Sequence, residues 1–239
     1  MQLLVSVAGP REARAALAGG ADIIDAKDPR TGALGAVRPQ VLRAVRSAVG
    51  ASRPVSAALG DAGPCALVER RARTAGSIGA TFVKVGFLGV GTGALARRRA
   101  AAARCGAGEL ARVVLVAYAD WRRADSLDPG ALVAVAADAG AAGVLLDTAV
   151  KTAGLFELLD PGTVGDWIAA AHAACLSAGL AGSLRGPDFA VAQTLGADLI
   201  EVQSAACIGG RTGRVSAARV AVLSALARPA PRVAAPALV

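Results

Sequence analysis

The sequence has few of the side chains on which metal sites, nucleic-acid binders and membrane proteins depend. Aromatic residues make up 3% of its 239 residues, histidine occurs once, and the four cysteines form no CxxC pair. We therefore expect no zinc site, which needs clustered cysteine and histidine, and no aromatic platform for stacking bases. No stretch approaches the roughly 20 uninterrupted apolar residues of a membrane span, so we expect no membrane partner.

The N-terminus and the cysteines indicate a cellular compartment. Residues 1–6 have no basic stretch ahead of their short apolar run, which is typical of a first strand and not of a signal peptide. Widely spaced free thiols fit a reducing environment. We expect a cytoplasmic protein.

The net charge of +8 is the one feature that suggests nucleic acid. Arginine, however, is spread over many predicted helices, with denser patches only at 70–73 and 97–99. Those patches have no aromatic neighbours and match no known nucleic-acid motif. We expect the charge to solubilise helix faces and to attract small anionic substrates, with no nucleic-acid partner.

Lysine is also scarce, and its placement is the strongest functional clue. The sequence has three lysines against 23 arginines, and Lys27, Lys84 and Lys151 all lie where a predicted strand ends. Arginine stays protonated at any working pH, whereas lysine can accept a proton or form an imine once its pKa is lowered. Lysine kept only at strand ends therefore suggests amine chemistry.

A sequence pattern, in which a predicted helix ends in Gly-Ala and an apolar strand follows, occurs four times, at Gly20, Gly79, Gly140 and Gly196. The pattern predicts strands near residues 3–8, 21–27, 53–59, 82–87, 113–119, 143–149, 178–184 and 199–205. It predicts helices near 10–18, 37–49, 64–78, 93–105, 129–139, 161–174, 187–195 and 215–227. Eightfold β-α alternation predicts a single (β/α)8 TIM barrel over residues 1–227, with a doubly wound sheet as the alternative. Residues 228–239, rich in Pro and Ala, are predicted to be a disordered tail.

Aligned on the glycine of this Gly-Ala pattern, four predicted strands carry charged residues on the same face. Offsets of five and seven from each glycine lie on the same face of a strand. Those offsets collect Asp25, Lys27, Lys84, Asp147 and Glu201. Because TIM-barrel active sites lie at the carboxyl ends of the strands, we expect these residues to meet at the mouth. Tyr118 and Asp120, at the end of the fifth strand, are weaker candidates.

Lysines interleaved with carboxylates suit imine-forming carbonyl chemistry. A neutral amine attacks a carbonyl, and the protonated imine then withdraws electrons while C–C bonds form or break. The aspartates would hold ammonium groups in place or relay protons. We expect Lys84 to have a lowered pKa and to act as a proton-transfer base, because an apolar strand and a second ammonium both favour the neutral amine. Buried Asp–Lys ion pairs with a purely structural role are the alternative.

Two glycine-rich loops are candidates for binding phosphate. They follow the seventh and eighth strands and contain Gly182-Ser183 and Gly209-Gly210. TIM barrels often hold phosphate at these two loops, through backbone N–H groups and a helix N-terminus.

Seven segments together resemble a known family over nearly the whole chain. They are Asp-Ile-Ile-Asp-Ala-Lys-Asp-Pro (22–29), Val-Ser-Ala-Ala-Leu-Gly-Asp (55–61), Phe-Val-Lys-Val-Gly (82–86), Ala-Tyr-Ala-Asp (117–120), Leu-Asp-Thr-Ala-Val-Lys (146–151), Leu-Ala-Gly-Ser-Leu (180–184) and Ala-Ala-Cys (205–207). This set is similar to (5-formylfuran-3-yl)methyl phosphate synthase, an enzyme family of methanofuran biosynthesis.

The resemblance implies a reaction and roles for individual residues. The enzyme would condense two molecules of glyceraldehyde 3-phosphate to a furan, releasing phosphate and water, without a metal or organic cofactor. Lys27 would form the Schiff base, Lys84 would transfer protons, and Asp25, Asp147 and Lys151 would be auxiliary polar residues. The chain departs from the family at 203–204, where Gln-Ser replaces the usual Arg-Gly, and its following Gly-Gly loop is shorter.

Two other functions remain open. One is a different aldolase-like barrel lyase acting on another phosphorylated aldehyde or ketone. The other is a non-catalytic barrel that binds sugar phosphate. The sequence leaves the oligomeric state open, a homo-oligomer included, and also the order of the two substrates and the fate of the furan.

Overall fold

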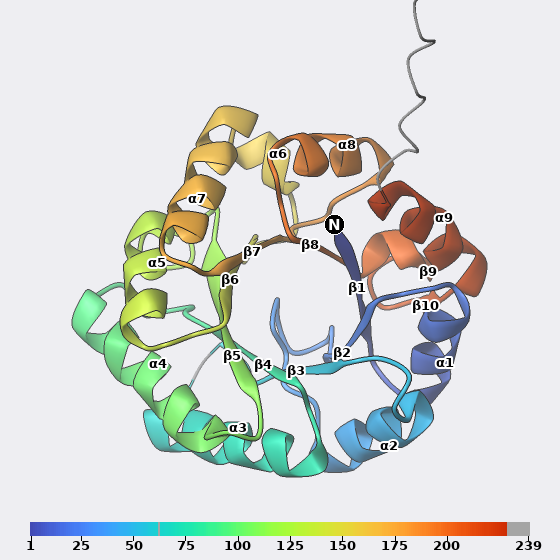
Figure 1. The fold of residues 1–239 in the computed structure, drawn as a ribbon, viewed down its shortest axis with the longest axis horizontal. Helices are drawn as coiled ribbons and strands as arrows, with labels where there is room; N and C mark the ends of the chain where they lie inside the picture. The colour runs from blue at the N-terminus through green and yellow to red at the C-terminus, as the bar shows by residue number, and fades with distance from the viewer. Residues whose placement is uncertain (62, 229–239) are drawn as a thin grey trace, which may run out of the picture.

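The computed structural model describes residues 1–61 and 63–228, and its eight parallel strands close into a barrel (Figure 1). The sheet closes because the first strand pairs with both the second and the eighth. This closure confirms the TIM barrel and excludes the doubly wound sheet. The strands are β1 (Gln2–Val7), β2 (Ile23–Ala26), β3 (Val55–Ala58), β4 (Phe82–Gly86), β5 (Arg112–Tyr118), β6 (Gly143–Asp147), β7 (Ser177–Leu180) and β8 (Leu199–Val202).

A ring of helices surrounds the barrel and buries its outer face (Figure 1). The helices are α1 (Pro10–Ala18), α2 (Pro39–Val49), α3 (Cys65–Ile78), α4 (Gly93–Ala107), α5 (Pro129–Asp138), α6 (Leu155–Leu158), α7 (Pro161–Ala173), α8 (Gly186–Thr194) and α9 (Ala217–Ala227). Proline opens several of them at the first turn, where its missing N–H costs nothing. Gly79 ends α3 with a φ of 96°, a left-handed conformation that favours glycine.

The structure differs from the predicted elements mainly on the side of the barrel where β7 and β8 end. These two strands end at Leu180 and Val202, several residues earlier than predicted. After β8 the chain forms elements that the pattern does not reveal: a 3-10 turn η1 (Ser204–Ala206) and a small hairpin of β9 (Cys207–Ile208) and β10 (Arg214–Val215). The short helix α6, between β6 and α7, is also absent from the predicted elements. The predicted tail lies outside the described residues, apart from Arg228.

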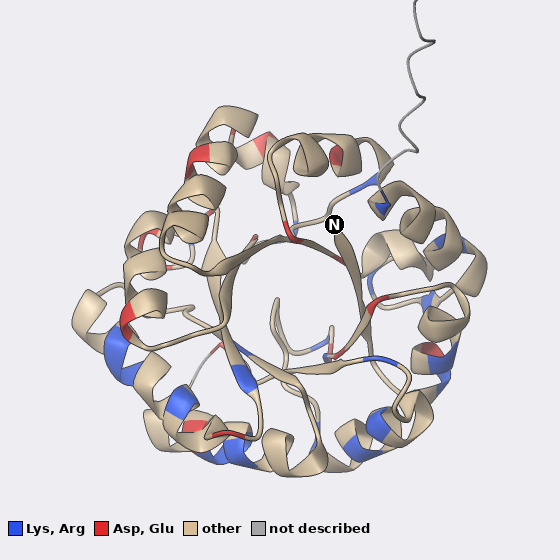
Figure 2. Ribbon diagram, in the orientation of Figure 1, with Lys and Arg blue, Asp and Glu red and all other residues tan. Residues whose placement is uncertain are grey.

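Basic residues lie mainly on the outside of one half of the ring. Figure 2 shows blue segments on α1 to α4, whereas the sequences of α5, α7 and α8 contain no lysine or arginine. Among the described residues, no helix has both the length and the apolar character needed to cross a membrane.

The interior of the barrel contains charged residues where most TIM barrels carry branched apolar side chains. Asp25, Lys84 and Glu201 point inward from β2, β4 and β8, and each is at most 3% exposed. Their side chains meet there, since Nζ of Lys84 lies 2.8 Å from Oδ2 of Asp25 and 2.6 Å from Oε2 of Glu201. The fold thus gathers three charges in its core.

Candidate active site

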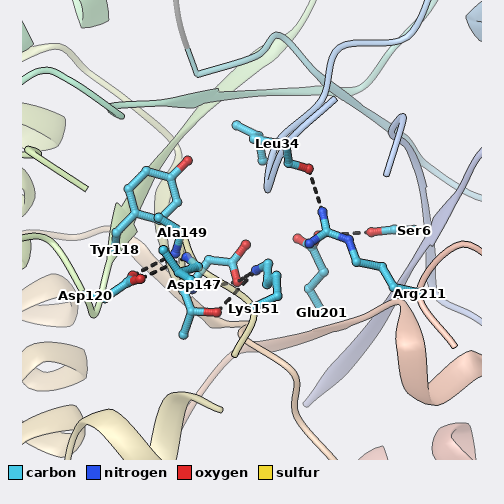
Figure 3. A network of polar contacts seen from close by, with 12 residues as sticks. Ser6, Leu34, Tyr118, Asp120, Asp147, Ala149, Lys151, Glu201 and Arg211 are labelled. Atoms are coloured by element: carbon cyan, nitrogen blue, oxygen red, sulfur yellow. Dashed lines mark hydrogen bonds and ion pairs between the residues drawn. The ribbon is translucent and has the colours of Figure 1, made fainter. Parts of the chain in front are cut away.

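Glu201 links two of the lysines. Its Oε1 accepts a hydrogen bond from Nζ of Lys27 at 2.8 Å, and its Oε2 accepts one from Nζ of Lys84 at 2.6 Å. Lys84 also donates to Oδ2 of Asp25 at 2.8 Å. Oγ of Ser6 lies 3.1 Å from Asp25 Oδ2 and 3.0 Å from Glu201 Oε1, and Figure 3 shows it beside Glu201. Four strands therefore build one connected polar network.

This network favours the charged forms of Lys84 and Glu201. Burial would lower the pKa of Lys84, but Asp25 and Glu201 outweigh burial, and the pKa rises above the ordinary value. Burial would likewise raise the pKa of Glu201, but Lys27 and Lys84 together keep it well below its ordinary value. The prediction of a lowered pKa for Lys84 is therefore wrong. The contact of Lys84 with two carboxylates decides the sign of the shift.

Lys151 is in a different electrostatic position. Its Nζ donates to Oδ1 of Asp147 at 2.5 Å and lies 3.4 Å from Oγ1 of Thr148 (Figure 3). Burial, assisted by the positive charges of Lys27 and Arg211, lowers the pKa of Lys151 although Asp147 opposes the shift. The lowered pKa makes Lys151 a better proton acceptor than an exposed lysine.

A cavity of about 430 Å³ lies at the carboxyl ends of β6 to β8. Lys27, Asp147, Lys151 and Glu201 line it. Lys84 instead lines a smaller cavity of about 210 Å³, together with residues from the amino ends of the strands, such as Gln2. The structure therefore places Lys27 and the Lys151–Asp147 pair where a substrate could reach them. Lys84 and Asp25 lie behind them in the barrel core.

The two glycine loops have different positions relative to the large cavity. Gly182 and Ser183 line it, and both adopt left-handed backbone conformations, with φ of 98° and 55°. A positive φ is unusual for serine and is often found at functional sites. Gly209 and Gly210 occupy the exposed turn between β9 and β10 and are not among the described residues that line the cavity. The residue of that turn that does line it is Arg211.

The two weaker candidates have supporting positions. Asp120 accepts hydrogen bonds from the backbone N–H groups of Ala149 (2.7 Å) and Val150 (2.9 Å), which fixes the loop that carries Lys151 (Figure 3). Tyr118 is fully buried and donates to Asp61, which also accepts from Leu34 N at 3.2 Å. Burial raises the pKa of both partners in the Tyr118–Asp61 pair.

Two supporting residues, Arg99 and Asp61, were not among the predicted site residues. Arg99 reaches in from α4 and donates to Gly86 O (2.7 Å) and Gly63 O (2.9 Å). Asp61 ties the β2–α2 loop to β5, as described above. Neither residue belongs to the strand pattern, so only the folded chain reveals these contacts.

Comparison with known proteins gives the family of the chain. The family model of 4-HFC-P synthase matches residues 3–224. The chain belongs to the 4-HFC-P synthase family. Its relatives include the (5-formylfuran-3-yl)methyl phosphate synthases of Methanosarcina mazei and Methanopyrus kandleri. The first is 37% identical over 220 residues (89% of this chain, 93% of that protein), and the second is 39% identical over 218 residues (89% and 92%). The synthase of Methanocaldococcus jannaschii is 34% identical, covering 95% of this chain and all of that protein.

Solved structures outside the 4-HFC-P synthase family share the fold. A 3-hexulose-6-phosphate synthase matches with a TM-score of 0.61 and 22% identity, covering 95% of this chain and 99% of that one. KGPDC from Streptococcus mutans matches with a TM-score of 0.63 and 15% identity, covering 94% and 96%. At these identities the likeness concerns the barrel alone.

Positions 203–204, where the sequence analysis expects a departure from the family, lie on the cavity wall. Gln203 and Ser204 both line the large cavity, next to Arg211. The Nη2 of Arg211 donates to Gly32 O at 2.5 Å, which connects the β9–β10 turn to the β2–α2 loop. A guanidinium therefore stands at this wall although position 203 is uncharged.

Proposed function

We propose that this protein condenses two molecules of glyceraldehyde 3-phosphate to (5-formylfuran-3-yl)methyl phosphate through an imine on Lys27. The observation that supports this most strongly is the placement of Lys27, on the cavity wall within 2.8 Å of Glu201 and in the same cavity as Lys151. An amine on the cavity wall, in the same cavity as a second amine of lowered pKa, suits imine formation.

The balance of atoms supports the choice of reaction. Two triose phosphates contain the atoms of the furan product, one phosphate and two molecules of water, with no oxidant or reductant left over. Tracing the carbons, the product needs a bond from C3 of one triose to C2 of the other. The first triose is the one that loses its phosphate, so the reaction is a lyase reaction that breaks carbon–oxygen bonds.

Lys27 activates the first triose. Its neutral amine would attack the aldehyde and form a protonated imine, and removal of the neighbouring C2 proton would then expel phosphate from C3. Removal of the C2 proton of the second triose, next to its own aldehyde, would make that carbon nucleophilic, and it would then add to the electron-poor C3 of the first triose. The oxygen on C2 of the first triose would then close the ring onto C1 of the second, and loss of two waters would complete the furan. Hydrolysis of the imine, which takes back the water released when it formed, would free Lys27 and the formyl group of the product.

Lys151 and Asp147 would move the protons. The lowered pKa of Lys151 suits it to take the C2 proton, and its hydrogen bond with Asp147 holds its amine at the cavity wall. Lys84, Asp25 and Glu201 would support the site from the barrel core without contacting substrate. The raised pKa of Lys84 keeps its ammonium group charged beneath the site. That fixed charge orients Glu201 toward Lys27. Gly182 and Ser183 are the proposed backbone contacts for a substrate phosphate.

The proposed setting is cytoplasmic, and the furan would serve methanofuran biosynthesis. A test is to incubate the purified protein with glyceraldehyde 3-phosphate and to measure product by mass spectrometry and phosphate release. The account expects one phosphate for each furan formed. Formation of a different carbonyl product would favour another aldolase-like lyase. Binding of the triose phosphate without any turnover would favour a non-catalytic barrel.

A further inference from the structure

A second cavity, of about 280 Å³, adjoins the large one at the mouth of the barrel. Gln203 and Arg211 line both cavities, so Arg211 stands in the wall between them. Arg30 and Arg38, from the β2–α2 loop, contribute two more guanidinium groups to the second cavity. We call it the Arg30–Arg38–Arg211 cavity.

Arg211 has a donor without an acceptor. Its Nη2 is bonded to Gly32 O, but its Nε is buried and lacks a hydrogen-bond partner in the described part of the chain. A buried donor left unpaired costs free energy, more so on a charged group. Arg211 nevertheless lines both cavities, and guanidinium groups bind phosphate well.

The two carboxylates in this cavity have backbone partners. Glu12 Oε2 accepts from Ala8 N at 2.7 Å, and Asp28 Oδ1 accepts from Arg30 N at 3.0 Å. Their charge is partly compensated by these N–H groups, and the lining has three guanidinium groups against two carboxylates. The cavity therefore favours an anion.

We propose that the Arg30–Arg38–Arg211 cavity binds the phosphate of the second triose, the one whose phosphate is retained in the product. This rests on the proposed function, which requires two phosphorylated molecules in adjoining positions. Lys27 fixes the first triose in the large cavity. The shared wall at Arg211 then places the second phosphate in the cavity next to the one that holds the first triose.

The test uses the double variant Arg30→Gln/Arg38→Gln, with Arg43→Gln on α2 as a control of equal charge loss per site. We expect the double variant to raise the KM for glyceraldehyde 3-phosphate at least about tenfold, because charge-assisted hydrogen bonds are lost. Borohydride trapping of the first triose on Lys27 should stay at the wild-type level. An unchanged KM would overturn the proposal, and so would a loss of trapping in parallel with turnover.

Binding of inorganic phosphate gives an independent result. Equilibrium dialysis should find two bound equivalents in the wild type and one in the double variant, while Arg211→Gln should weaken both. One equivalent in both wild type and double variant would contradict the second site. If the wild type binds two equivalents but forms no trappable imine, the second site stands and the proposed function fails.

Discussion

Nζ of Lys84 lies 2.6 Å from Oε2 of Glu201, in a barrel core where both side chains are almost completely buried. Glu201 also accepts from Lys27, so one carboxylate joins a lysine of the core to a lysine of the cavity wall. This relationship connects the stability of the barrel with the proposed chemistry.

Removing the charge of Glu201 should destabilise the fold strongly. Glu201→Gln leaves Lys84 with one carboxylate in a buried site, and breaking a buried ion pair typically costs about 3–5 kcal/mol. Urea unfolding would measure the loss. Glu69→Gln is the matched control, because Glu69 pairs with Arg73 on the exposed face of α3 and such pairs contribute only about 0–1 kcal/mol. Equal effects of the two substitutions would contradict the network.

The contribution of Glu201 should depend on pH in a defined direction. Its pKa is depressed in the folded protein, so its stabilisation is present above the ordinary value of 4.5 and is lost as the pH falls toward the folded-state pKa. The difference in unfolding free energy between wild type and Glu201→Gln should therefore shrink between pH 7 and pH 3. A difference that stays constant over this range would refute the depressed pKa.

Replacing Asp147 should change the pKa of Lys151, the proposed proton acceptor. Asp147 raises the pKa of Lys151, so Asp147→Asn should lower that pKa further. The acidic limb of the pH profile of kcat/KM should then move to lower pH, with a lower maximal rate. Lys151→Arg, which cannot accept protons, should reduce turnover by roughly 10²–10⁴-fold. A Lys151→Arg enzyme with near-normal turnover would remove Lys151 from the mechanism.

Gly86 should be intolerant of any side chain. A Cβ at this position would overlap with Oδ1 of Asp61 and crowd the hydroxyl of Tyr118. Gly86→Ala should cost about 1–3 kcal/mol through overpacking. Adding Asp61→Ala should recover part of this loss, which thermal unfolding of the single and double variants would show. Additive losses would mean that the two positions are not in contact.

Much of the barrel could be predicted because each strand and helix is encoded locally. The Gly-Ala pattern marks the end of a helix and the start of a buried strand. Counting from its glycine, with side chains alternating along a strand, placed Asp25, Lys84 and Glu201 on one face. The sign of the pKa shift of Lys84 could not be predicted in the same way. It depends on distances of 2.6 and 2.8 Å between strands far apart in sequence.

The loops were harder to predict, for a physical reason. Loop residues follow no period, so nothing in the sequence showed that Arg211 would reach the cavity while Gly209 and Gly210 form an exposed turn. Arg99 and Asp61 likewise act through backbone groups of other segments. Such contacts depend on the folded chain and leave no local pattern.

The central claim is that Lys27 forms the covalent imine, and reductive trapping tests it most directly. The wild type and Lys27→Arg would be treated with glyceraldehyde 3-phosphate and borohydride, digested, and analysed by peptide mass spectrometry. The account predicts a triose-derived mass increase on the peptide containing Lys27 and loss of both adduct and furan in Lys27→Arg. An adduct on Lys84 or Lys151 instead, or furan formation by Lys27→Arg, would contradict it.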